Sequence, residues 1–232
     1  MLKKLAAIIV LSFAFAGTAS ADALNDAMAE YEAANYKAAL AGFKPLAEQG
    51  NATAQTYMGI LLNGGGSYGI PRDRKEALKW FTKAVEQGDA EGQFKFGNFY
   101  TMEYPETKEN LEESVKWYTK AAEQGHAEAQ WHLGLAYYIR DPLIPQDYNE
   151  AVKWLRKSAE QGFSLAQNTM GSFYESGLGV PVDYVLAYKW YNLASVSPYD
   201  WGGGRSRDKL ARMMTPEQIA EAQRLSREWK PY

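Results

Sequence analysis

The tripeptide Glu-Gln-Gly occurs four times in this chain, and its spacing constrains the fold more than any other feature. Its glycines, which lie 38, 37 and 37 residues apart, are Gly50, Gly88, Gly125 and Gly162. Similarity within a chain at a fixed period of about 20 to 50 residues is typical of repeat proteins. Because each repeat buries its apolar surface only against its neighbours, we expect a stack of similar units.

Further residues recur at fixed distances within each unit. A glutamine lies five residues after each of these glycines, and a second glycine lies nine residues after it. Near the end of each unit a tryptophan is flanked by small residues three positions before and four positions after, which places all three on one face of a helix. We therefore expect the tryptophans in the core, and not as ligand-stacking rings. They are Trp80, Trp117, Trp154 and Trp190.

The ends of the predicted helices are marked by short polar residues and by glycine. A helix N-cap is predicted seven residues before each tryptophan, at Asp73, Asn110, Asp147 and Asp183. A glutamate three residues later predicts a capping box in three units, at Glu76, Glu113 and Glu150. The glycine of Glu-Gln-Gly is expected just past the helix end, where the backbone turns left-handed.

Each unit therefore reads as a first helix (helix A), a proline-containing loop, a second helix (helix B) and a tight turn. Asn51 and Asp89 are suitable N-caps for helix A, whereas His126 and Phe163 are expected to be poor ones. The second glycine falls inside helix A, where it lowers helix stability by about 1 kcal/mol relative to alanine. Its recurrence predicts that the backbones of paired helices touch there.

The first 21 residues have the features of a secretory signal peptide. Lys3 and Lys4 precede an apolar run of about 12 residues, Leu5–Ala16, and small residues follow up to Ala21. The run is shorter than the roughly 20 residues that span a bilayer. We expect cleavage after Ala21 and a periplasmic or secreted protein; the alternative is an uncleaved membrane anchor.

Composition and motif searches exclude several function classes. The net charge of −3 gives little support for nucleic-acid binding. The chain has no cysteine, which excludes disulfides, thiolate metal sites and a cysteine nucleophile. His126 and His132 are six residues apart, so they do not share a helix face, and the glycine run Gly64–Gly69 lacks the Lys-Ser/Thr of a phosphate-binding loop. We predict no catalytic, cofactor or metal site.

The third unit carries a family resemblance. The segments GHAEAQWHLGLAYY (Gly125–Tyr138) and QDYNEAVKWLRKSAEQG (Gln146–Gly162) resemble the Sel1-like repeat family, whose members are α/α solenoids related to tetratricopeptide repeats. The resemblance implies an all-α fold, a right-handed superhelix of helical pairs. The implied order is a signal peptide (1–21), an N-terminal helical pair (22–49), four repeats (50–87, 88–124, 125–161 and 162–197), and a linker with a closing helix (198–232). Gly202–Arg205 is assigned to this linker, and the closing helix is expected to begin with a capping box at Thr215.

The resemblance also implies a function, because members of this family are usually interaction modules. We expect a monomeric, non-catalytic scaffold that binds a protein or peptide partner in envelope signalling or assembly. The alternatives are a secreted factor that binds a host protein and, less favoured, a cell-wall enzyme that uses acidic residues.

In related solenoids the concave face is lined by helix A positions −6, −3, +1 and +4, counted from the second glycine. From these positions the candidates for partner binding are Phe94, Asn98, Trp131, Leu135, Tyr138, Asn168 and Ser172. Aromatic rings beside amides favour peptide binding. The alternative is that the rings pack against the adjacent A helices.

Overall fold

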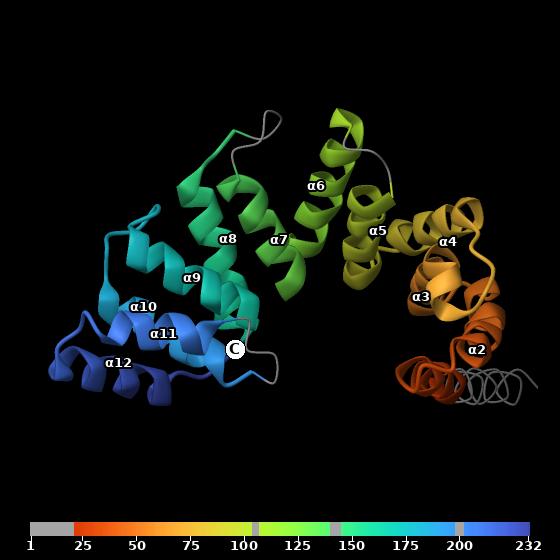
Figure 1. Ribbon diagram of the computed structural model, residues 1–232. Helices are drawn as coiled ribbons and strands as arrows, with labels where there is room; N and C mark the ends of the chain where they lie inside the picture. The colour runs from red at the N-terminus through yellow and green to blue at the C-terminus, as the bar shows by residue number, and fades with distance from the viewer. Residues whose placement is uncertain (1–20, 104–106, 140–144, 198–201) are drawn as a thin grey trace, which may run out of the picture. The chain divides into compact units, whose positions relative to one another are not determined.

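The computed structural model describes residues 21–103, 107–139, 145–197 and 202–232, so most of the predicted signal peptide and residues 198–201 of the predicted linker lie outside it. No strand occurs among the described residues, which confirms the all-α fold (Figure 1). Residues 21–32 are helical. The later helices of the first half are α2 (Tyr36–Glu48), α3 (Ala52–Gly64), α4 (Arg74–Glu86), α5 (Ala90–Glu103) and α6 (Lys108–Glu123), with a 3-10 turn η1 (Gly65–Tyr68) after α3. Those of the second half are α7 (Ala127–Tyr138), α8 (Tyr148–Glu160), α9 (Ser164–Ser176), α10 (Tyr184–Ser195), α11 (Gly203–Ala211) and α12 (Pro216–Glu228).

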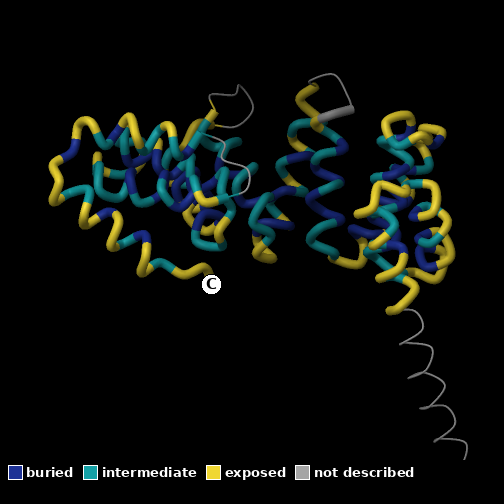
Figure 2. The backbone as a smooth tube through the Cα atoms, turned by 60° about the horizontal axis from the view of Figure 1, so that its bottom comes forward, coloured by how far each residue is buried: buried dark blue, intermediate teal, exposed yellow. Residues whose placement is uncertain are grey.

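The chain divides into two compact units, Met1–Phe99 and Tyr100–Tyr232, with the boundary inside α5. In the first unit α2 packs on α3 and α3 packs on α4. In the second unit each helix from α6 to α10 packs on the next, and α10 also contacts α11 and α12. Within each unit the buried residues lie where neighbouring helices face one another, and the exposed residues lie on the outward sides of the helices and at the turns (Figure 2). Helices α3, α5, α7 and α9 each begin just after a Glu-Gln-Gly glycine, so they are the A helices of the repeats, and α4, α6, α8 and α10 are the B helices.

The four Glu-Gln-Gly glycines have the left-handed backbone that the sequence predicts. Their φ angles are +95° at Gly50, +80° at Gly88, +93° at Gly125 and +91° at Gly162. At the first three, nothing lies within 4 Å of the place that a Cβ atom would take. The glycine is thus required by the backbone angle alone and not by crowding.

Replacing Gly88 by alanine is expected to lower the free energy of unfolding by about 1–2 kcal/mol, the cost of a left-handed residue that carries a Cβ. Urea unfolding followed by circular dichroism measures the change. Gly66→Ala is the matched control, because its Cβ would also meet nothing within 4 Å and its backbone lies outside the left-handed region. Equal losses in the two variants would contradict the conformational explanation.

The predicted N-caps are confirmed at three of four B helices. The side chains of Asp73, Asp147 and Asp183 accept hydrogen bonds from backbone N–H groups of α4, α8 and α10. The prediction for α6 was wrong, because this helix begins earlier and is capped by Thr107, whose Oγ1 accepts from the backbone N–H of Asn110 at 3.3 Å. Threonine is itself a good N-cap, and it adds almost one turn to the helix.

Two other capping predictions differ from the structure. The carboxylates of Glu76 and Glu150 accept hydrogen bonds from Lys79 and Lys153, at 2.7 and 2.9 Å, in place of completing capping boxes. His126, expected to be a poor cap, accepts from the backbone N–H of Ala129 through Nδ1 at 3.1 Å. A neutral imidazole offers one acceptor nitrogen, which does here what a carboxylate oxygen does elsewhere.

The repeated tryptophans are core residues, as predicted, although Trp117 is only half-buried. Trp80, Trp154 and Trp190 are 7%, 7% and 5% exposed. A lysine covers the outward side of each ring, for example Lys157, whose Nζ lies 4.6 Å from the Trp154 ring centroid. The lysine stem and charge shield the part of the indole that the core does not.

The second glycine of the first, third and fourth repeats makes room for a side chain of helix B. A Cβ at Gly59 would lie 2.8 Å from the Phe81 ring, and one at Gly134 would lie 2.6 Å from Cγ of Leu155. The prediction that two backbones touch there holds only in part: the residue that follows the repeated tryptophan packs directly on the glycine, and at Gly134 the Cβ position also lies 3.2 Å from the carbonyl oxygen of Ala151 on helix B. This contact sets the distance between helix A and helix B in a pair.

The recurring glutamines connect successive helices by buried hydrogen bonds. Gln130 is 3% exposed, and its Nε2 donates to the carbonyl oxygen of Ala122 at 3.0 Å. Its Oε1 accepts from Nε2 of Gln161, the glutamine of the next Glu-Gln-Gly, at 2.8 Å. Gln55 makes the same pair of bonds, to Ala47 and from Gln87. The sequence showed the period of these residues but assigned them no role.

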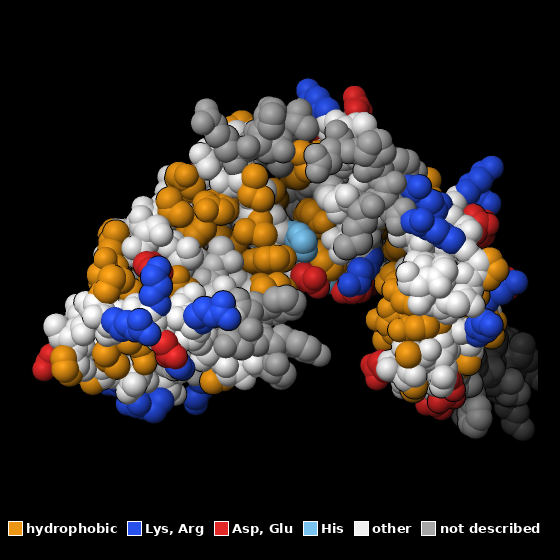
Figure 3. Space-filling model, in the orientation of Figure 1, with side chains coloured by type: hydrophobic (Ala, Val, Ile, Leu, Met, Phe, Trp, Pro, Cys, Tyr) orange, Lys and Arg blue, Asp and Glu red, His pale blue; other side chains and the backbone are white. Residues whose placement is uncertain are grey.

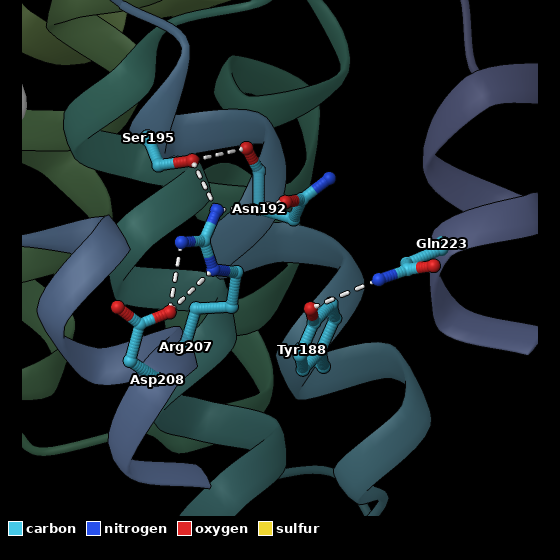
Figure 4. Close-up of polar contacts among 6 residues, drawn as sticks. All are labelled: Tyr188, Asn192, Ser195, Arg207, Asp208 and Gln223. Carbon is cyan, nitrogen blue, oxygen red and sulfur yellow. Dashed lines mark hydrogen bonds and ion pairs between the residues drawn. The ribbon is translucent and has the colours of Figure 1, made fainter. Parts of the chain in front are cut away.

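The predicted linker at Gly202–Arg205 is wrong, because Gly203 already begins α11. This helix is attached to α10 by Arg207, whose Nη1 donates to Asn192 Oδ1 at 3.1 Å and to Ser195 Oγ at 3.3 Å (Figure 4). The predicted closing helix is confirmed as α12, and Thr215 and Gln218 form its capping box. Two helices therefore cover the last repeat where one was expected.

Candidate interaction surface

The helix A positions predicted to bind a partner do not share one environment. Position −3 of the first repeat is Thr56, which is fully buried and donates through Oγ1 to Asp89 Oδ2, the N-cap of α5, at 3.1 Å. Position −3 of the third repeat is Trp131, whose Nε1 donates to Thr169 Oγ1 on α9 at 3.3 Å. In both repeats position −3 reaches the A helix of the next repeat, so it contributes to stacking.

Phe94 holds the same position in α5, and its side chain is 0% exposed. It was proposed as a surface ring, and the structure corrects this. A ring with no exposed surface has none to offer a partner.

Trp131 is fixed in position but only half-buried. Its ring centroid lies 4.8 Å from that of His132, edge to face, and 5.8 Å from that of Phe163. The hydroxyl of Thr169 donates to the carbonyl oxygen of Leu165 at 2.7 Å, which turns an acceptor lone pair toward the indole. Edge-to-face pairs and a satisfied N–H restrict an aromatic ring, so the exposed part of Trp131 is presented without a large entropic cost.

Leu135 lies four residues after Trp131 along α7, and Tyr138 lies three residues after Leu135. Both are half-buried. The Tyr138 ring centroid lies 5.1 Å from that of Phe173 and 6.2 Å from that of Tyr148. Residues with this spacing share one helix face. We call Trp131, Leu135 and Tyr138 the α7 stripe. Hydrophobic side chains also gather over α7 and α8 in the space-filling view (Figure 3).

The polar candidates flank this stripe only in part. On α9, Asn168 is half-buried and Ser172, one turn later, is exposed. Asn98 is half-buried and belongs to the first compact unit. The second unit therefore brings together five of the seven proposed residues, three on α7 and two on α9.

Sequence reasoning missed the residues that support this surface. Thr169, Phe163 and His132 hold Trp131, and no motif marks them. Near Ser172, the hydroxyl of Tyr191 donates to Glu175 Oε2 at 2.7 Å. Burial, and then this hydrogen bond to the carboxylate, raise the pKa of Tyr191 above its usual range. The phenol therefore stays neutral and keeps its proton on the bond to Glu175.

The described part of the chain shows neither a metal-binding cluster nor a membrane-spanning helix. No group of three or more His, Asp or Glu side chains in residues 21–103, 107–139, 145–197 and 202–232 is arranged to hold a metal ion. Over the same ranges, none of the helices combines the length and the apolar character that crossing a bilayer requires. Of the two histidines, His126 caps α7 and His132 stacks on Tyr118 with ring centroids 5.0 Å apart.

Solved structures similar to this chain share its fold. A protective antigen of uropathogenic Escherichia coli, described as displaying an SLR fold, is 36% identical, with a TM-score of 0.75, over 83% of this chain and 40% of the antigen, so the match spans well under half of that protein. A Sel1 repeat protein from Oxalobacter formigenes is 28% identical, with a TM-score of 0.66, over 89% of this chain and 85% of that one. An immunity protein from Pseudomonas aeruginosa is 16% identical, with a TM-score of 0.51, over 88% and 83% of the two chains, and shows similarity of fold alone. No curated protein matches the chain.

A protein-family model gives the assignment. The model of the Sel1 repeat matches four times in succession, at residues 52–89, 90–126, 127–163 and 164–195. Sel1 repeats are protein-interaction scaffolds, and the family is generally non-catalytic. The matched segments cover more than half of the sequence and contain every A and B helix described above. The chain belongs to the Sel1 repeat family.

Proposed function

We propose that this chain is an exported, non-catalytic scaffold, and that the α7 stripe with Asn168 and Ser172 on α9 binds a protein or peptide partner. The observation that carries the proposal is the state of Trp131: a ring held by a hydrogen bond and two aromatic contacts, yet half-exposed. Rigid aromatic side chains of this kind dominate binding energies at protein interfaces. Asn168 and Ser172 add amide and hydroxyl groups that can pair with a peptide backbone.

The carboxylates that recur in the repeats support the non-catalytic part of the proposal. Asp73, Asp147 and Asp183 are each engaged by backbone N–H groups at a helix start. Glu76 and Glu150 pair with lysines on their own helices. A general acid or base has to contact its substrate. These carboxylates are instead engaged by backbone N–H groups or lysines of the protein.

A bulky charge at Ser172 is expected to weaken partner binding at least tenfold while leaving the fold intact. Ser172 is exposed, so an arginine there blocks the surface without disturbing the core. Affinity capture from an envelope extract with quantitative mass spectrometry identifies the partner, and titration then gives the affinity of the Ser172→Arg variant. Ala220→Arg, at an exposed position on α12, which packs on α10, is the control and should bind normally. Undiminished binding by Ser172→Arg would exclude this surface.

A second candidate is a secreted factor that binds a host protein, and the similarity to a protective antigen favours it. The two candidates differ in where the mature chain is found. Recovery from periplasmic extract supports the envelope scaffold, and recovery from the culture medium supports the secreted factor.

A further inference from the structure

The segment that follows α12 lies across the Glu-Gln-Gly turn of the last repeat. The hydroxyl of Tyr232 donates to the carboxylate of Glu160, and the backbone N–H of Tyr232 donates to the carbonyl oxygen of Glu160 at 3.4 Å. Trp229 and Pro231 pass over Gly162, at 3.7 and 3.9 Å from the place that a Cβ atom would take. The Glu-Gln-Gly turn at Gly162 therefore binds an extended peptide segment. Glu160 accepts its hydrogen bonds, and Gly162 leaves room for it to pass.

The other three turns present the same groups, and the described residues leave their glycines uncovered. The glutamates that precede the glycines, which are all exposed, are Glu48, Glu86 and Glu123. Nothing lies within 4 Å of the Cβ position at Gly50, Gly88 or Gly125. Each turn thus offers a carboxylate and a main-chain carbonyl beside an open glycine, the set of groups that Tyr232, Pro231 and Trp229 contact at Gly162.

Of these three turns, the one formed by Glu123–Gly125, at the start of the third repeat, lies beside a cavity. It opens onto a cavity of ≈ 360 Å³ lined by Glu123, Gly125, Gln130, Lys157 and Gln161, with Tyr232 at one side. The side-chain amides of Gln161 and Gln130 are fixed in the chain of hydrogen bonds that ends on the carbonyl oxygen of Ala122. A preformed concave site with few polar groups that are already ordered binds a ligand at low entropic cost.

We propose that this third turn, Glu123–Gly125, is a second binding site, and that it takes an extended partner peptide in which a tyrosine follows a proline. The Glu123 carboxylate accepts the tyrosine hydroxyl, and the Glu123 carbonyl oxygen accepts a peptide N–H. The proline of the peptide lies over Gly125. A residue other than glycine at position 125 would place a Cβ atom between the protein and the peptide. Proline also favours the extended conformation before binding. The site includes none of the α7 stripe residues and does not depend on the function proposed above.

The test uses the full chain labelled with 15N and the acetylated, amidated peptide Glu-Trp-Lys-Pro-Tyr. We expect saturable shifts of the Gly125 amide and of the Gln130 side-chain amide in two-dimensional NMR spectra. A peptide with phenylalanine in place of tyrosine should bind at least fivefold more weakly. Glu123→Ala, an exposed change that leaves the core intact, should weaken binding at least tenfold, whereas the matched change Glu86→Ala in the first compact unit should leave the Gly125 shifts unaltered.

A second variant examines the turn that the chain already fills. Tyr232→Ala vacates the turn and leaves the Glu160 carboxylate in place, so the peptide should gain a further site marked by shifts at Gly162. The proposal is overturned if the Gly125 amide does not shift at millimolar peptide, or if Glu123→Ala binds as well as the parent. Concentration-dependent dimerisation that Tyr232→Ala abolishes would assign the turn to a second copy of this chain and would also overturn it.

Discussion

Replacing Gln130 by glutamate is expected to lower the free energy of unfolding at pH 7 by about 3 kcal/mol or more. The side chain is 3% exposed, and its Nε2 donates to the carbonyl oxygen of Ala122 at 3.0 Å. Glutamate keeps the acceptor for Gln161 but turns a charged oxygen toward that carbonyl. A buried charge without a compensating donor costs several kcal/mol.

The loss should depend on pH in a direction that identifies its cause. Burial raises the pKa of the introduced carboxyl above its unfolded value of about 4.3. Below that pH the group is protonated in both states and can donate to Ala122, so the penalty is absent; it grows as pH rises toward the folded-state pKa. Urea titrations between pH 4 and 8 measure this. The control Gln49→Glu, at the exposed glutamine of the first Glu-Gln-Gly, should change stability by less than about 0.5 kcal/mol. A loss that is constant with pH would contradict the burial argument.

Replacing Gly171 by alanine is expected to destabilise the second compact unit by up to about 3 kcal/mol, the upper range for overpacking a core. The new Cβ would lie 2.5 Å from Cδ1 of Tyr191. That ring is 3% exposed and is tied by its hydroxyl to Glu175 at 2.7 Å, so it has little room to move. The sign is informative, because in an exposed helix the same change stabilises by about 1 kcal/mol.

Thermal and urea unfolding of Gly171→Ala, with Ser176→Ala on the exposed side of α9 as control, measure this effect. A double-mutant cycle with Tyr191→Ala locates it. If the clash with the ring is the cause, the double variant should lose at least 1 kcal/mol less than the sum of the single losses. Additive losses would place the cause elsewhere.

The sequence predicts the fold because the features that define it are local. A left-handed turn at Gly88, a capping carboxylate at Asp73 and a tryptophan between two small residues each follow from the geometry of one helix or one turn. Four copies at one period then fix the architecture. The alternation of helix A and helix B needed no knowledge of contacts between repeats.

The candidate surface was less predictable because it depends on how repeats stack. Position −3 is polar at Thr56 and aromatic at Phe94 and Trp131, and only the structure shows that Thr56 and Trp131 reach the next repeat and that Phe94 is buried. Likewise, three consecutive glycines indicate a linker, yet Gly203 starts α11 because Arg207 attaches that helix to α10. Contacts of this kind join residues that no local pattern relates.

The glutamine bonds have a consequence for how such a chain can change in length. Gln130 receives its hydrogen bond from a glutamine 31 residues later and gives one to a carbonyl eight residues earlier. Gln55 does the same at distances of 32 and eight. Because these two joints are chemically alike, inserting or deleting one whole repeat reproduces the same pair of bonds at the new junction. A deletion that removes part of a helix pair breaks them, whereas the one-residue difference between 31 and 32 leaves them intact. Whole repeats and single loop residues are therefore the units in which such a chain can change length.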